Sequence, residues 1–294
     1  MSEQPWSRAK GPFAVALGPP LLWLFGFFLV PMGIVWIYSL SETRGLTDVV
    51  FTGGFRNYLR TLDPLYLGVL WKSAWIAGAT TLACLIAGFP VALAIAFAKG
   101  RAKTWLLILV MLPFWTNLLI RTYALMAVLR TEGLVNQAVG WLWTRAAHVL
   151  PLPAFEPLPL LHNNFAVVVG LIYVELPFMV LPLYAALDRL DRSLLEASMD
   201  LGAGRWRTLW EIAVPVALPG VVSGVIITFI PSLGSYLTPD LLGGPDSQMI
   251  ANVIERQFKR ANDWPFGSAL SFMLMYLTFL ALAAQGLWSR RRKA

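Results

Sequence analysis

The chain contains 294 residues, of which 57% are hydrophobic and only 13% are charged, and its mean hydropathy is +0.65. This composition lies outside the usual range of soluble domains, so it excludes a soluble enzyme or binding domain and indicates a membrane protein. The formal net charge is +7 and the pI is ≈ 9.8. Such values also fit nucleic-acid binding, but the placement of the charges favours a signal for membrane topology.

Long apolar segments recur along the whole chain. A helix that crosses a bilayer needs roughly 20 apolar residues. Six segments meet this criterion, at about 13–39, 70–98, 105–129, 165–187, 216–237 and 267–288. We therefore predict an all-α, polytopic membrane helix bundle that forms a single transmembrane domain over residues 1–294.

The first segment, 13–39, is too long for the core of a signal peptide, and no small-residue cleavage site follows it, so we expect it to be retained. The second segment, 70–98, contains the only cysteine, Cys84. An intramolecular disulfide is therefore excluded, and a packing role is expected.

Positive charges gather on one side of the predicted bundle. If both termini are cytoplasmic, the cytoplasmic segments carry 13 Lys and Arg residues against 6 Asp and Glu, whereas the outer segments carry 9 of each kind. The loop KGRAK at 99–103 and the tail RRRK at 290–293 contribute most to this excess. Since cytoplasmic loops are enriched in Lys and Arg, we predict that both termini lie in the cytoplasm.

Arg121 in the third segment and Glu175 in the fourth are the ionisable residues at membrane depth. Charges there are costly, so such residues are functional candidates by default. Three interpretations remain open: an ion pair that joins the two spans, attraction of a cationic substrate by Glu175, or extension of the side chains towards solvent.

Two outer segments are predicted to be helical. Residues 134–150 mix apolar and aromatic side chains with few charges, which is typical of a helix lying in the membrane interface. An extended, proline-rich connection should follow it. Residues 248–260 place apolar side chains along one helical face and should pack at the mouth of the bundle.

The longest polar segment on the cytoplasmic side is 188–214. The run from Ser193 to Glu196 fits a capping box, which predicts a helix that starts at Ser193. Gly202 can take the positive φ that ends a helix, and a second short helix from Arg205 to Ala213 should be stopped by Pro215. We predict two helices joined by a turn, too short to be stable without a surface to rest on.

Within this segment, EASMDLGAGRWRTLWEIAVP at 196–215 resembles the cytoplasmic signature of ABC importer permeases. The signature reads Glu-Ala-Ala, three residues, Gly, nine residues, Ile, any residue, Leu-Pro. Ser198 replaces its second alanine and Val214 its leucine, and the spacing is intact. In that family the segment is a coupling helix that docks on a cytoplasmic ATPase. The resemblance implies that coupling involves Glu196, Ala197, Ser198, Asp200, Leu201, Gly202 and Ala203.

The resemblance narrows further over most of the chain. Runs such as LPFWTNLLIRTYAL (112–125), LTPDLLGGPDSQMI (237–250) and NDWPFGSAL (262–270) look like the spermidine/putrescine importer permeases. This likeness implies a type I ABC importer permease in a bacterial inner membrane. It also implies a second, homologous permease as heterodimer partner, two copies of an ABC ATPase and a substrate-binding protein. ATP and magnesium would be bound by the ATPases, and this chain would bind no cofactor.

A polyamine carries several ammonium groups, so its passage should offer carboxylates and aromatic faces. The candidates at suitable depth are Trp115, Tyr123, Tyr173, Glu175, Tyr236 and Asp240. The alternative for each aromatic residue is ordinary placement at the membrane interface.

The sequence argues against catalysis by this chain. It contains no G-x-x-x-x-G-K-[ST] phosphate loop, so ATP must be hydrolysed by a partner. His148 and His162 lack the spacing of a metal site, and no metal or nucleic-acid partner is expected. The alternatives are an ABC permease for opines, aminoethylphosphonate, ferric iron or thiamine, a secondary carrier working alone, or a membrane scaffold.

Overall fold

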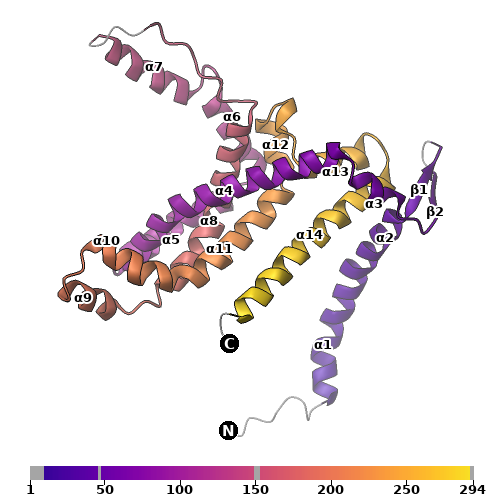
Figure 1. Ribbon diagram of the computed structural model, residues 1–294, viewed down its shortest axis with the longest axis horizontal. Helices are drawn as coiled ribbons and strands as arrows, with labels where there is room; N and C mark the ends of the chain where they lie inside the picture. The colour runs from indigo at the N-terminus through magenta and orange to yellow at the C-terminus, as the bar shows by residue number, and fades with distance from the viewer. Residues whose placement is uncertain (1–9, 46–47, 149–152, 292–294) are drawn as a thin grey trace. The chain divides into compact units, whose positions relative to one another are not determined.

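The computed structural model describes residues 10–45, 48–148 and 153–291 (Figure 1). Parts of two predicted segments lie outside these ranges: residues 149–150 of the predicted interfacial helix, and Arg292 and Lys293 of the positively charged tail. The chain divides into two compact units. The first consists of Met1–Leu67 with Ile254–Ala294, and the second of Gly68–Val253.

The first unit is helical except for one hairpin. It contains α1 (Lys10–Leu24), a π-helical turn (Phe25–Leu29), α2 (Val30–Ser39), strands β1 (Ser41–Arg44) and β2 (Asp48–Phe51), α3 (Arg56–Thr61) and α14 (Trp264–Arg291). The strands pair antiparallel with Ser41 opposite Phe51. No strand was predicted, so the hairpin is an addition to the predicted all-α fold.

Polar contacts tie the hairpin and α3 to the start of α14. Asn57 donates to the carbonyl of Ser41 at 2.7 Å. Arg60 pairs with Asp263 at 2.7 Å, and its guanidinium lies 3.9 Å from the centre of the Phe266 ring. This end of the first unit is thus fixed by side chains that are distant in the sequence.

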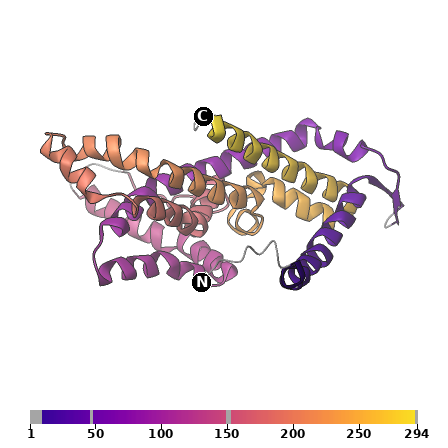
Figure 2. The ribbon, with the colours of Figure 1, turned by 90° about the horizontal axis from the view of Figure 1, so that it is seen from below.

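The second unit contains most of the helices. They are α4 (Pro64–Phe97, whose first turn belongs to the first unit), α5 (Arg101–Met111), α6 (Leu118–Leu129), α7 (Leu134–Ala147), α8 (Asn164–Leu187), α9 (Arg192–Asp200), α10 (Arg205–Thr208), α11 (Val214–Gly234), α12 (Leu237–Leu242) and the first turn of α13 (Ile250–Lys259), whose remaining residues belong to the first unit. In Figures 1 and 2, α9 and α10 project as a hairpin beyond the ends of α8 and α11.

The core of this unit forms where α8 and α11 cross closely. A Cβ on Gly220 would lie 2.6 Å from the Pro182 carbonyl oxygen, and one on Gly224 would lie 2.7 Å from the Met179 sulfur. The partner residue moves back along α8 as α11 advances, so the two helices run antiparallel. Glycine at these positions lets the backbones approach, as in many membrane helix pairs.

Five helices in the described residues are long and apolar enough to cross a membrane: Ala14–Ser39, Pro64–Phe97, Asn164–Leu187, Arg205–Gly234 and Trp264–Ala283. The segment predicted as the third span, 105–129, is broken. Arg101–Trp115 and Leu118–Ala147 meet at 95°.

The break has a local cause. Pro113 lies in a 3₁₀ turn (Leu112–Trp115), Thr116 is extended, and the side chain of Asn117 accepts from the Leu119 N–H at 2.8 Å to start α6. The sequence predicted one spanning helix over 105–129. The structure instead ends one helix and caps another.

The two helices expected in the outer segments are confirmed by α7 and α13. Residues 153–160 adopt neither helix nor strand, as predicted for the proline-rich connection. Placement of α7 in the membrane interface stays a prediction.

Candidate functional site

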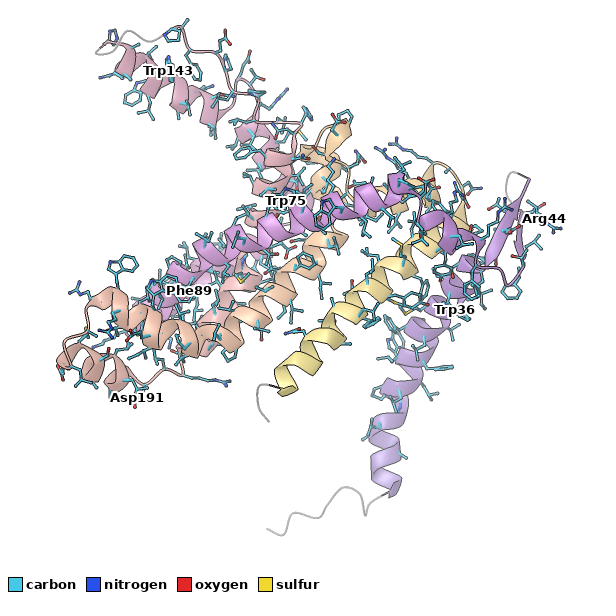
Figure 3. The ribbon with its side chains drawn as sticks, viewed as in Figure 1. Trp36, Arg44, Trp75, Phe89, Trp143 and Asp191 are labelled. Carbon is cyan, nitrogen blue, oxygen red and sulfur yellow. The ribbon has the colours of Figure 1, made fainter. Side chains whose placement is uncertain are left out.

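The coupling segment, residues 188–214, begins with a helix cap that differs from the predicted one. Asp191, labelled in Figure 3, is the N-cap of α9, and its carboxylate accepts from the Ser193 N–H at 3.0 Å. Ser193 lies inside the first turn, so the predicted capping box from Ser193 to Glu196 is wrong. Asp191 takes the role because α8 ends at Leu187, which leaves the cap position to the aspartate.

The other end of α9 is a Schellman motif. Gly202 has φ +86, its N–H donates to the Met199 carbonyl at 3.0 Å, and the Ala203 N–H donates to the Ser198 carbonyl at 3.1 Å. This bond pattern satisfies the last carbonyls of the helix and needs a left-handed residue. The predicted helix end at Gly202 is confirmed.

The second helix of the segment does not stop at Pro215. A π-helical turn (Leu209–Ala213) joins α10 directly to α11, so one apolar helix extends over Arg205–Gly234. The wider π turn accommodates a proline that would otherwise clash with the preceding turn. The predicted stop at Pro215 is therefore wrong, and the turn after α9 leads directly into the fifth predicted span.

A groove of about 380 Å³ lies between α9 and the helix that begins with α10. Four of the predicted coupling residues line it, namely Ala197, Ser198, Leu201 and Ala203. Glu196, Asp200 and Gly202 lie on the exposed surface of the same segment. The Ser198 and Thr208 hydroxyls are 3.0 Å apart and close the hairpin.

The apolar side chains of the segment divide into two sets. Leu195 and Leu209 pack against the core of the second unit. Leu201 is 89% exposed, and Trp206 and Trp210 are also exposed. The first set anchors the hairpin, while the second leaves large apolar groups without a partner in the described chain, as on interaction surfaces.

An ion pair fixes the entry to the coupling segment. Lys103 Nζ lies 2.6 Å from Asp188 Oδ1 and 5.2 Å from the centre of the Tyr184 ring. The bond to Asp188, followed by the one to Tyr184, raises the pKa of Lys103. The pair links the first turn of α5 to the point where α8 ends.

Replacing Asp191 with alanine should loosen α9. The Ser193 N–H and hydroxyl bond to the ionised carboxylate, and they hold the pKa of Asp191 below its ordinary value. The cap's contribution is therefore complete above that ordinary value and is lost as the pH falls through the lowered folded-state pKa. At neutral pH, Asp191→Ala should raise amide hydrogen exchange in Leu194–Asp200 several-fold.

Ser193→Ala is the matched control, because it keeps the backbone bond to Asp191. Its effect on exchange should be smaller. If Ser193→Ala instead loosened α9 more than Asp191→Ala did, the cap would be Ser193 after all.

The passage candidates do not share one environment. Trp115 is 75% exposed at the break between α5 and α6, and Tyr123, Tyr173 and Tyr236 are also exposed. Asp240 lies on the exposed side of α12. Glu175 is buried within the second unit, so the structure separates it from the exposed aromatic surfaces.

Arg121 and Glu175 are both buried, so neither extends to the surface of the described chain. The ion pairs among the described residues do not include this one. Arg121 Nε and Nη1 and Glu175 Oε2 have no hydrogen-bond partner. The predicted direct pair is not formed.

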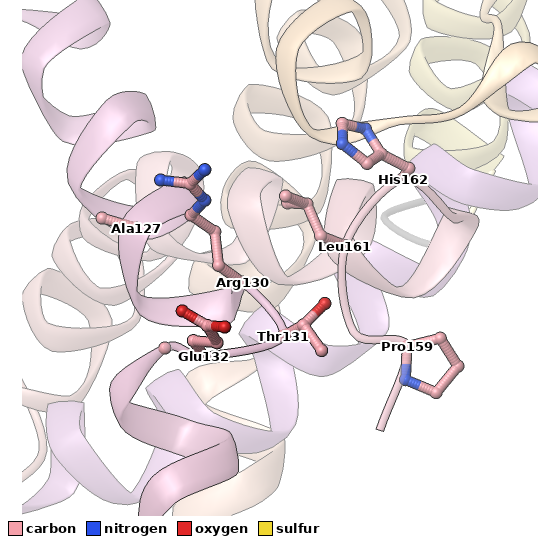
Figure 4. A pocket seen from close by; sticks show the side chains of 8 residues that line it. Ala127, Arg130, Thr131, Glu132, Pro159, Leu161 and His162 are labelled. Atoms are coloured by element: carbon pink, nitrogen blue, oxygen red, sulfur yellow. The ribbon is translucent and has the colours of Figure 1, made fainter. Parts of the chain in front are cut away.

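Sequence reasoning missed a pocket where α6 ends and α8 begins. Its volume is about 640 Å³, and Arg130, Glu132 and His162 lie around it (Figure 4). His162 has φ +61, and its N–H donates to the Leu242 carbonyl at 2.9 Å. Pro159 comes from the connection before α8, so only the folded chain brings these residues together. The part of the chain that the structure describes holds no group of three or more His, Cys, Asp or Glu suited to a metal.

Comparison with known proteins extends these observations. The family model of binding-protein-dependent transport system inner membrane components matches residues 85–294. The chain is 38% identical over 262 residues to the spermidine/putrescine transport system permease protein PotB of Escherichia coli (strain K12), covering 88% of this chain and 91% of that protein.

Two solved structures share the fold. One is a bacterial ABC transporter involved in the import of the acidic polysaccharide alginate, with a TM-score of 0.72, 16% identity, and coverage of 97% of this chain and 98% of that chain. The other is the bacterial alginate transporter in complex with an alginate pentasaccharide-bound periplasmic protein, with a TM-score of 0.70, 17% identity and coverage of 98% of both chains.

Proposed function

The chain belongs to the family of binding-protein-dependent transport system inner membrane components, and we propose that it is the permease subunit of an ATP-driven importer that moves spermidine or putrescine. The predicted family and type I importer permease fold are confirmed. The chain is a multi-pass inner-membrane protein. From the distribution of its positive charges we place both termini in the cytoplasm. The observation that supports a polyamine as the cargo is the 38% identity to the polyamine permease over 88% of this chain.

Its role in that importer is mechanical. Two partner ATPases bind ATP and magnesium, while this chain contributes the coupling segment and binds no cofactor. The exposed Leu201, Trp206 and Trp210 side chains supply an apolar docking surface for one ATPase. When the ATPases close, α9 moves with them and carries the attached ends of α8 and α11.

Alternating access then opens the bundle towards a substrate-binding protein on the outer side. A second, homologous permease completes the passage, and the whole of residues 1–294 acts as one permease domain. The exposed rings of Trp115, Tyr123, Tyr173 and Tyr236 offer aromatic faces to ammonium groups, each contact stabilising by about 0.5–2 kcal/mol. Asp240 adds a carboxylate at the outer mouth.

Uptake in cells that lack their own polyamine importers tests the cargo. Cells expressing this chain with its partner permease, ATPase and binding protein should accumulate labelled spermidine or putrescine in an ATP-dependent manner. The matched control omits only this chain. Accumulation of an opine, aminoethylphosphonate, ferric iron or thiamine without polyamine uptake would contradict the polyamine assignment. It would still agree with an ABC permease.

A further inference from the structure

Glu175 is one of several polar side chains that are buried in the second unit. Its side chain is 5% exposed, that of Arg121 is 8% exposed, and Thr228 is completely buried. These residues come from α8, α6 and α11. A polar layer inside an apolar helix bundle needs partners for its donors and acceptors.

Helix register places Thr228 opposite Glu175. Gly220 faces Leu183, and four residues later Gly224 faces Met179. Because the helices run antiparallel, one further turn along α11 and one turn back along α8 place Thr228 opposite Glu175.

The contacts of α6 and α4 with α8 indicate that Arg121 and Cys84 lie at the same depth in the bundle as Glu175. Leu125 lies against Gly170, so Arg121, one turn earlier on α6, faces the next turn of α8. Cys84 Sγ lies 3.9 Å from the Ile172 carbonyl oxygen. Both Arg121 and Cys84 are within electrostatic range of Glu175.

The atoms in the layer that lack a hydrogen-bond partner include both donors and acceptors. Arg121 Nε and Nη1 can only donate, Glu175 Oε2 accepts when ionised, and the Thr228 hydroxyl can do either. A metal cation would satisfy the acceptors but leave the guanidinium unbonded and add repulsion. Water donates and accepts, and it occupies buried sites that offer two to four polar partners.

We infer that this layer is a binding site for ordered water, which bridges Arg121 to Glu175 and Thr228. The site takes the place of the direct ion pair. It lies between the helices that flank the coupling segment, so water-mediated bonds can exchange when α8 and α11 shift, without leaving a charge unpaired. The inference holds whatever the cargo is.

Radiolytic hydroxyl-radical labelling tests it, because radicals formed from bound water oxidise neighbouring sulfur. The complex is irradiated in nanodiscs with Leu183→Cys introduced into this chain, so that the two sulfurs compared are both thiols. Residue 183 is as fully buried as Cys84 but lies about two helical turns from Glu175 along α8. Cys84 should be oxidised roughly tenfold faster than the introduced sulfur.

Thr228→Val should slow Cys84 oxidation severalfold by removing one partner of the water. Thr81→Val is the matched control, since the Thr81 hydroxyl already bonds to the Ala77 carbonyl at 2.7 Å. Equal oxidation at Cys84 and position 183 would overturn the site. If Cys84 is oxidised fast and Thr228→Val leaves that rate unchanged, the water does not bind at Thr228, which overturns this part of the inference. If Thr228→Val does not assemble, the comparison of the two sulfurs still decides.

Discussion

Gly202→Val is expected to abolish ATP-driven uptake. Gly202 holds φ +86 at the end of α9, a conformation that costs a β-branched residue on the order of 1–3 kcal/mol. A Cβ there would meet nothing within 4 Å, so the penalty comes from the backbone and not from a clash. Valine should open the two Schellman bonds and displace the exposed Leu201 from the proposed docking surface.

The measurement is ATP hydrolysis and substrate uptake by the complex in proteoliposomes, with co-purification of the ATPase as the assembly check. Gly204→Val is the matched control, because Gly204 has φ −68 and ψ 160, an extended conformation that valine adopts readily, and also has open space around it. Loss of coupling or of assembly in Gly202→Val alone agrees with the coupling role. Normal uptake in that variant contradicts it.

Gly220→Ala should strongly destabilise the second unit. The new Cβ would lie 2.6 Å from the Pro182 carbonyl oxygen, 2.7 Å from the Ala186 Cβ and 3.1 Å from the Leu183 Cα. Two of these atoms belong to the backbone of α8, which cannot rotate away. Overpacking of this kind costs about 1–3 kcal/mol, so the thermal unfolding midpoint of the purified complex should fall by several degrees.

Gly234→Ala provides the comparison within the same helix, because a Cβ at Gly234 would meet nothing within 4 Å. This variant should unfold at the temperature of the original protein. Equal midpoints for Gly220→Ala and the original protein would show that α8 and α11 do not approach as closely as the structure places them.

Apolar length made the helices predictable. Segments such as 165–187 and 267–288 have few polar residues, and the structure places apolar helices there. The break in 105–129 was missed because a proline within a span can either kink a helix or end it. Asn117 decides the outcome by capping α6, and that requires an extended backbone that hydropathy does not reveal.

Caps and pairings depended on tertiary structure. Asp191 and Ser193 are both good capping residues, and the end of α8 at Leu187 selects Asp191. The hairpin of Ser41–Arg44 with Asp48–Phe51 lacks an alternating apolar pattern and gave no strand signal. Opposite charges predicted that Arg121 and Glu175 lie near each other, but whether they touch depends on how α6 packs against α8.

The coupling segment was the most predictable part of the candidate site. Its spacing fixed the helix end at Gly202, since a positive φ at a glycine is a strong local requirement. The groove residues Ala197, Ser198, Leu201 and Ala203 also came from the signature. The pocket at Arg130 and His162 was not predicted, because it is formed by segments that only the fold brings together.

The proposed role of this chain is to couple a partner ATPase to polyamine import. The most direct measurement is ATP hydrolysis by the complex that co-purifies with this chain in nanodiscs, with its binding protein present, titrated with spermidine, putrescine and unrelated amino compounds. We expect a co-purifying ATPase that polyamines alone stimulate. Stimulation by an unrelated compound instead of a polyamine would contradict the cargo, and the absence of any co-purifying ATPase would contradict the claim itself.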